Sequence, residues 1–443
     1  MQVGAVLVFD AGPLELRHGG IDIERVRAYT AARLSSAPRA QQRPIDLAFG
    51  PLPLALGRPL AWIDDPFFSL EYHVRHAALP RPGDERQLKR LAARIFSQSL
   101  DREKPPWELC FVEGLEDGRF ALIAKVGTEL AAGADGLDPL AALLSESAGE
   151  GVDAAPRAET RPTPGRLALM RAELARRARE ITRPEALGAA LGSGLRGALN
   201  ALERALATAD DVPLTGPAGP HRRIEWLALD DADLCAVAER LAATPHELLL
   251  ATLAGALRVF LSRRGLEPDA HELRALTPIC VDENDGAEAP LIALPVEEPD
   301  PLRRLDALRA VPEPAGRAGS GLDVLRDLAD LHVAAAAGRP ASLCVTDLCT
   351  TSAPLFLLGA PLRACIPIAP LIAGHSLGIA AIRRDGRATL GFTGDAALVT
   401  DLPLLADAVA SAFDELRRLS SATVHPASPR ADQSRVRNSR AEA

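Results

Sequence analysis

The amino-acid sequence predicts an α/β protein built from two large domains. Its 443 residues are too many for one ordinary hydrophobic core and about right for two. Strand-like and helix-like patterns alternate in both halves, whereas residues 149–165 are rich in Gly, Pro, Ala and charge and have no periodicity. We therefore expect an N-terminal domain at 1–148, a linker with helices at 149–221, a C-terminal domain at 222–419 and a disordered tail at 420–443.

The N-terminal half is predicted to begin with a strand and to end with a short helix. Its central feature is a hairpin, because two β-rich runs at 107–115 and 120–126 flank the turn residues Asp117 and Gly118. Around this hairpin we expect, in chain order, a strand, a helix, an extended segment, an amphipathic helix and a final helix, at residues 3–9, 21–34, 67–78, 84–100 and 137–145.

The C-terminal half is predicted to follow two Ala-, Arg- and Leu-rich helices at 167–181 and 186–207. Its helix at 245–263 has the clearest start, because Thr244 can cap it, Pro245 takes the first position and Glu247 completes a capping box. The other expected elements are strands at 223–229, 273–281, 291–296, 342–348, 375–382 and 388–392, and helices at 232–241, 301–310, 321–337 and 402–419.

Composition and charge argue against several classes of function. The net charge is -9 and no sustained basic run occurs outside the tail, which argues against nucleic acid as a partner. No apolar run approaches the roughly 18 residues that span a bilayer, and the first residues do not resemble a signal peptide. We therefore expect a soluble, cytoplasmic protein. The six scattered cysteines lack a His pair to complete a zinc site, so we expect buried thiols and no metal.

Two short motifs match known patterns in their letters. Residues 192–197 (Gly-Ser-Gly-Leu-Arg-Gly) fit a dinucleotide-binding pattern, but no predicted strand precedes them. Residues 374–378 (Gly-His-Ser-Leu-Gly) match the nucleophile elbow of esterases around Ser376. A strand is predicted to follow Ser376, and the only later histidine, His425, lies in the polar tail. We expect Ser376 to be a strand residue and keep an esterase as an alternative function.

A further set of motifs occurs in a characteristic order. In the N-terminal half it comprises residues 68–76 (Phe-Ser-Leu-Glu-Tyr-His-Val-Arg-His), 100–102 (Leu-Asp-Arg), 105–108 (Pro-Pro-Trp-Glu) and 125–133, the end of the hairpin. In the C-terminal half it comprises residues 244–251, where a helix starts, and 345–348 (Val-Thr-Asp-Leu). From residue 3 to about residue 419 this set resembles the wax ester synthase/diacylglycerol acyltransferase family. The resemblance implies two CoA-dependent acyltransferase-like domains, of the chloramphenicol acetyltransferase and condensation-domain type. It also implies an interdomain tunnel for acyl-CoA and a long-chain alcohol or diacylglycerol.

The resemblance implies a catalytic motif, His-His-x-x-x-Asp-Gly, at the end of the hairpin's second strand. In the family a histidine of this motif takes the proton of the acceptor hydroxyl, and the Asp holds the loop. Here the two histidines fall on Gly127 and Thr128, the Asp falls on Ala132, and only Gly133 remains. Loss of a general base costs about 10²–10⁴ in rate. No catalytic residue of the motif is intact, so the sequence predicts a pseudoenzyme or a nearly inactive enzyme.

Other residues could substitute for the missing base or line the tunnel. Glu129 adjoins Thr128 but is expected to be a surface carboxylate. His246 stands where the family has Asn. The nearby helix N-terminus would keep its imidazole neutral, as a base requires. Helix capping is the simpler role for this residue. Trp107 and Glu108 match a Pro-Leu-Trp-Glu pattern of the family and are the tunnel candidates, with plain burial of the Trp as the alternative.

Three functions therefore stay open. The first is a family member whose acyl transfer to diacylglycerol or a long-chain alcohol is lost or strongly reduced, and which still binds acyl-CoA or neutral lipid, or partners an active homologue. The second is an active acyltransferase with His246 or Glu129 as a relocated base. The third is the esterase. No cofactor is expected, since acyl-CoA would be a substrate or ligand, and the resemblance implies peripheral contact with a membrane or lipid droplet.

Overall fold

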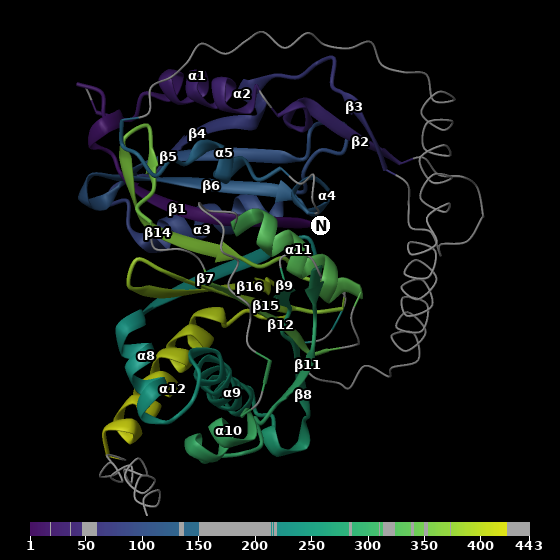
Figure 1. Cartoon of the computed structure of the whole chain (residues 1–443), viewed down its shortest axis with the longest axis vertical. Coiled ribbons are helices and arrows are strands. Elements are labelled where there is room, and N and C mark those ends of the chain that lie inside the picture. The colour runs from purple at the N-terminus through teal and green to yellow at the C-terminus, as the bar shows by residue number, and fades with distance from the viewer. Residues whose placement is uncertain are drawn as a thin grey trace, which may run out of the picture.

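The computed structural model contains two mixed β-sheets that lie between two layers of helices (Figure 1). The first sheet has the strand order β13-β14-β1-β6-β5-β4, and the second has the order β11-β8-β12-β15-β16-β7. The structure describes residues 1–422 except residues 18, 36, 47–59, 133–136, 150–213, 215, 217, 218, 283–285, 310, 313–323, 338–340, 350–352 and 373.

The elements have the following bounds. The strands of the first sheet are β1 (Gln2–Asp10), β4 (Val74–Ala78), β5 (Trp107–Leu115), β6 (Arg119–Gly127), β13 (Phe356–Leu357) and β14 (Ala360–Ile368). Those of the second are β7 (Arg222–Asp230), β8 (Leu273–Leu276), β11 (Leu291–Leu294), β12 (Leu343–Cys349), β15 (Leu377–Arg384) and β16 (Arg387–Asp395). Two small sheets pair β2 (Gln42–Asp46) with β3 (Leu60–Asp64), and β9 (Ile279–Asp282) with β10 (Gly286–Glu288).

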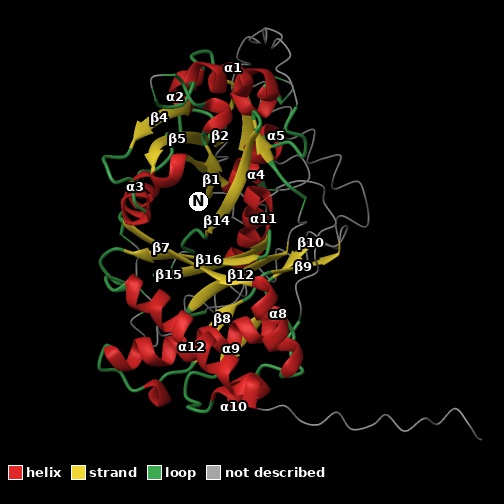
Figure 2. Ribbon diagram, turned by 90° about the vertical axis from the view of Figure 1, so that its left-hand side faces the viewer, coloured by secondary structure: helices red, strands yellow, loops and turns green. Residues whose placement is uncertain are grey.

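The helices lie outside the sheets or between them. The N-terminal helices are α1 (Ile23–Leu34), α2 (Leu70–His73), α3 (Glu85–Ser97), α4 (Thr128–Ala131) and α5 (Pro139–Leu143). The C-terminal helices are α8 (Asp231–Arg240), α9 (Pro245–Arg263), α10 (Pro301–Ala307), α11 (Val324–Ala337) and α12 (Leu402–Ala422). In the side view α3 and α11 lie between the two sheets, on opposite sides of the molecule (Figure 2), and α3 contacts β7 while α11 contacts both β1 and β12.

The predicted hairpin forms the centre of the first sheet. β5 and β6 pair in antiparallel fashion, and β6 pairs in turn with β1, where Ala5 lies opposite Ala124. Side chains alternate between the two faces of β1, so Val3, Ala5 and Leu7 join one core cluster while Val6 joins the cluster beneath α3. Both faces of the strand are therefore buried.

Strand β14 links the two halves, and it was not predicted. It belongs to the range 222–419 but pairs with β1 in the first sheet, where Pro367 lies opposite Ala5. Prolines at 361 and 367 argue against an inner strand, which explains the omission. β14 also crosses β16 at Gly391, where an added Cβ would lie 1.9 Å from the carbonyl oxygen of Pro367. The close approach of the two sheets at this crossing therefore requires glycine.

The two longest helices of the C-terminal half follow the sequence pattern closely. Helix α9 has the predicted bounds, and Thr244 and Glu247 form the expected capping box. Fourteen residues of α9 are buried, because α12, α10 and the second sheet surround it. Helix α12 continues to Ala422, past the predicted end at residue 419.

Several local predictions were wrong. Residues 67–78 are not extended throughout, because α2 forms within them before β4 begins. The strand expected at 273–281 is two strands, β8 and β9, which belong to different sheets. No sequence pattern indicated the antiparallel pairing of β2 with β3. The helices predicted at 167–181 and 186–207, and the glycine pattern at 192–197, lie outside the described residues.

Candidate functional site

The residues at the positions of the implied catalytic motif lie where the first sheet ends beside α4. Gly127 is the last residue of β6 and its N–H donates to the carbonyl of Pro106 at 2.7 Å. Thr128 begins α4, and its N–H donates to the carbonyl of Met1 at 3.1 Å. The side chain of Thr128 is buried, and Ala132 is half-buried. A neutral hydroxyl and a methyl group thus occupy the positions of the implied base and anchor, while Gly133 lies outside the described residues.

Glu129 is exposed, as predicted, but its carboxylate turns back over the motif. An added Cβ on Gly127 would lie 2.7 Å from Oε1 of Glu129. The carboxylate therefore occupies the space where the side chain of the first motif histidine would begin. It is the only acidic group so close to Gly127 within the described part of the chain.

His246 forms a buried pair with Asp347. Its Nδ1 lies 3.0 Å from Oδ2 of Asp347, and both residues are more than nine-tenths buried. The second ring nitrogen, Nε2, is buried and has no hydrogen-bonding partner among the described residues. A histidine oriented by a carboxylate with its other nitrogen free is an arrangement that general bases use.

The His246–Asp347 pair lies on the far side of the second sheet from Thr128. Asp347 of β12 is paired with Ala381 of β15, so both side chains point to the same face. Ala381 belongs to the core cluster of the α9 leucines, whereas Ala380 belongs to the cluster that contains Leu130 of α4. The sheet therefore separates this pair from the motif.

The tunnel candidates Trp107 and Glu108 lie in the core of the first half. Trp107 is fully buried, stacks on His73 with ring centroids 4.5 Å apart, and donates from Nε1 to the carbonyl of Ala40 at 2.8 Å. Glu108 forms ion pairs with Lys125 at 3.0 Å and with Arg75 at 3.1 Å. The indole N–H of Trp107 and both carboxylate oxygens of Glu108 are therefore engaged in hydrogen bonds or ion pairs.

Lys125 explains why Glu108 is buried. Its side chain is fully buried, and its ammonium group also donates to the carbonyls of Ile95 and Gln98 at the end of α3. Burial lowers the pKa of Lys125, and the charge of Glu108 opposes that shift. The pair therefore joins β5 and β6 to α3.

Ser376 does not have the geometry of an esterase nucleophile. The strand β15 follows it directly, whereas a nucleophile elbow continues into a helix. Ser376 is fully buried, and its Oγ has no hydrogen-bonding partner among the described residues. No histidine in the described part of the chain is therefore in place to take its proton.

Two buried histidines lie near the motif, at the interface between the halves. His332 of α11 and His375, which precedes β15, are 2% and 6% exposed. The pKa of each is lowered to about 4, mainly by burial, and for His332 the amino group of Met1 and the ring of His375 contribute to the shift. We call these two residues the interface histidines. His332 carries no sequence signal, because it lies in an ordinary apolar helix.

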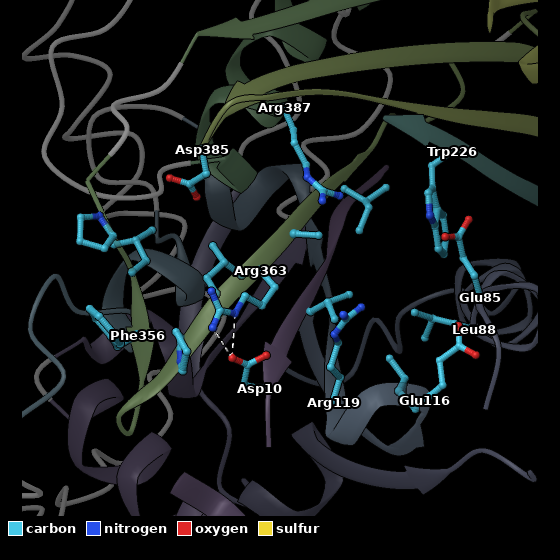
Figure 3. A pocket seen from close by; sticks show the side chains of 18 of the residues that line it. Asp10, Glu85, Leu88, Glu116, Arg119, Trp226, Phe356, Arg363, Asp385 and Arg387 are labelled. Carbon is cyan, nitrogen blue, oxygen red and sulfur yellow. Dashed lines mark hydrogen bonds and ion pairs between the residues drawn. The ribbon is translucent and has the colours of Figure 1, made fainter. Parts of the chain in front are cut away.

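A cleft opens at the other end of the first sheet. It has a volume of about 830 Å³ and is lined by β1, the β5–β6 turn, β7, β14 and β16. Arg119 and Arg387 point toward it from opposite halves, and Arg363 pairs with Asp10 at its edge (Figure 3). Arg119 begins β6 and Gly127 ends it, so about 26 Å of strand separates this cleft from the motif.

Neither a membrane span nor a metal cluster is found in the described parts of the chain. No helix there is both long and apolar enough to cross a bilayer. No group of three or more His, Cys, Asp or Glu side chains is placed there to hold a metal ion.

Comparison with known proteins gives consistent matches. Residues 1–245 match the model of the wax ester synthase/diacylglycerol acyltransferase catalytic domain, and residues 321–417 match the model of its C-terminal domain. A putative diacylglycerol O-acyltransferase of Mycobacterium tuberculosis (strain CDC 1551 / Oshkosh) is 30% identical over 376 residues, which cover 82% of this chain and 79% of that protein. Another from the same strain is 27% identical over 452 residues, which cover 95% and 87%.

Solved structures share the fold at lower identity. The wax ester synthase/diacylglycerol acyltransferase from Marinobacter aquaeolei VT8 superposes with a TM-score of 0.63 at 21% identity, over 95% of both chains. The first condensation domain of the calcium-dependent antibiotic synthetase superposes with a TM-score of 0.52 at 16% identity, over 95% of this chain and 91% of that one.

Proposed function

Because the chain belongs to the wax ester synthase/diacylglycerol acyltransferase family, we propose that it is a member whose acyl transfer is lost or strongly reduced. The reaction in question moves an acyl group from acyl-CoA to diacylglycerol or a long-chain alcohol. The protein keeps the fold and binds acyl-CoA or a neutral lipid without efficient turnover.

The observation that carries this proposal is the side chain at Thr128. It stands at the position of the implied general base, at the end of β6 and the start of α4. An aliphatic hydroxyl cannot accept a proton at neutral pH, so the acceptor alcohol would remain protonated during its attack on the thioester. Ala132 cannot replace the Asp that would anchor the loop. The expected cost is about 10²–10⁴ in rate.

A second candidate is an active acyltransferase with a relocated base. The position of the Glu129 carboxylate over Gly127 favours Glu129 within this candidate. His246 has the better-oriented imidazole, but the second sheet lies between it and the motif. Substitution of each residue separates the two: Glu129→Gln should abolish ester formation in the first case, and His246→Ala in the second.

The test is ester formation by the purified full chain from radiolabelled acyl-CoA with diacylglycerol or hexadecanol. Binding of the same labelled acyl-CoA is titrated in parallel. The proposal predicts binding without ester above the enzyme-free background. Ester formation at an ordinary enzymatic rate, on the order of 1 s⁻¹ or more, would refute it.

We also propose that the protein acts at a membrane or lipid-droplet surface. Its partners there are acyl-CoA, a neutral lipid and an active homologue. Co-sedimentation with neutral vesicles that contain diacylglycerol tests the surface contact. Failure to sediment with them, compared with vesicles that lack diacylglycerol, would remove this part of the proposal.

A further inference from the structure

We propose that the interface histidines form a binding site for the hydroxyl group of an uncharged lipid. This inference rests on the proposed function, because it names the chemical group that the retained lipid-binding site recognises. Neither residue belongs to the degenerate motif, and the two lie 43 positions apart on a helix and on a loop.

The site lies where the two halves meet, next to the degenerate motif. On one face of α11, His332 lies between Leu328, which packs in the cluster of Leu130 and Ala131, and Ala335, which packs against Cys344 of β12. His332 interacts electrostatically with His375 and with the amino group of Met1. The carbonyl of that same Met1 accepts the N–H of Thr128, so the ring of His332 lies near the motif.

The hydrogen bonds of His375 leave it one free acceptor. Its ring bonds the backbone carbonyl of Ala341 and therefore donates a proton there. Nδ1 is buried and has no partner among the described residues. In a neutral imidazole the nitrogen that carries no proton is an acceptor, so Nδ1 requires a donor.

His332 adds a second unsatisfied nitrogen. Its Nε2 is also buried without a partner in the described part of the chain. Buried polar groups are nearly always hydrogen-bonded, because an unpaired one has lost its water without compensation. Two such nitrogens, on rings from different elements that interact electrostatically, indicate a site that a ligand completes.

The chemistry of the two rings selects the ligand. A carboxylate or an ester has only acceptors and cannot satisfy Nδ1 of His375. An ammonium group would meet the positive amino group of Met1 close to His332. A hydroxyl group can donate to Nδ1 of His375, and its oxygen can accept from Nε2 of His332 when that nitrogen carries the ring proton. The apolar residues around it, Ala335, Ile372 and Leu276, suit an acyl or alkyl chain.

The test compares two probes that differ in one hydrogen-bond donor, because a methyl group replaces the hydroxyl hydrogen in the second. Radiolabelled 1-hexadecanol and its methyl ether, 1-methoxyhexadecane, are delivered from cyclodextrin, and bound lipid is separated by gel filtration. We expect the wild-type chain to bind the alcohol about 3- to 10-fold more tightly than the ether, the range that one hydrogen bond contributes. His375→Phe should remove this preference and leave ether binding unchanged.

Two further variants serve as controls. His375→Asn can keep an acceptor near the position of Nδ1 and should retain part of the preference, whereas exposed His221→Phe should retain all of it. Equal binding of alcohol and ether by the wild type would overturn the hydroxyl site alone. Binding of neither probe would overturn lipid binding itself, and ester formation with added acyl-CoA would overturn the loss of catalysis. Unchanged ether binding shows that each variant is folded.

Discussion

Restoring the motif should restore catalysis if the missing base is what limits the enzyme. The variant Gly127→His/Thr128→His/Ala132→Asp returns the two histidines and the aspartate. A Cβ at position 127 would lie 2.7 Å from Oε1 of Glu129, so that carboxylate must rotate away. The rotation costs little, because Glu129 is exposed and its charge can remain solvated. The change at Thr128 is more demanding, because that side chain is 6% exposed.

The expected gain is about 10²–10⁴ in the rate of ester formation, the usual contribution of a general base. The assay is single-turnover transfer from radiolabelled acyl-CoA to diacylglycerol, with the variant lacking only the Thr128→His change as the control. That control should stay at the wild-type rate. No gain in a triple variant that remains folded and binds acyl-CoA would refute the reasoning, because some other defect would then limit turnover.

Three further predictions concern stability. Lys125→Met should lower the free energy of unfolding in urea by about 3–5 kcal/mol, because Glu108 stays buried without its main partner. The reasoning fails if the double variant Lys125→Met/Glu108→Leu is less stable than Lys125→Met alone. Gly391→Ala should cost about 1–3 kcal/mol, because the new Cβ would clash with Pro367, whereas Gly12→Ala has open space and serves as the control. The interface histidines have a folded pKa of about 4 against 6.5 when unfolded, so below pH 6.5 only the unfolded chain gains their protons. Their contribution to stability, up to ~3 kcal/mol each, should disappear between pH 6.5 and 4. A flat urea midpoint over that range would contradict the burial of neutral rings.

Local sequence signals predicted those elements that depend on local interactions. The capping box at Thr244 and Glu247 fixed the start of α9, and the Asp117-Gly118 turn fixed the β5–β6 hairpin. The two-domain acyltransferase-like fold, expected from the resemblance, is confirmed by the comparisons. Strand β14 was missed because its pairing with β1 joins residues more than 350 positions apart, and its prolines mask the strand pattern.

The candidate site was only partly predictable for the same reason. The replacements that we propose at Gly127, Thr128 and Ala132 could be inferred from the sequence, because the implied motif is continuous. The contact between His246 and Asp347 and the proximity of the interface histidines depend on how the second sheet and α11 pack. No residue spacing encodes these contacts, so they emerge only from tertiary structure.

The rate of one acyl transfer by the unaltered protein tests the central claim most directly. The full chain, in excess over radiolabelled acyl-CoA, is mixed with diacylglycerol at pH 7 and quenched over minutes to hours. We predict that the label leaves the thioester only at the rate of spontaneous hydrolysis. Until then the labelled acyl-CoA should remain bound to the protein. Transfer of the label into triacylglycerol within seconds would contradict the account. Such a rate would require a general base, and Thr128 cannot take the hydroxyl proton.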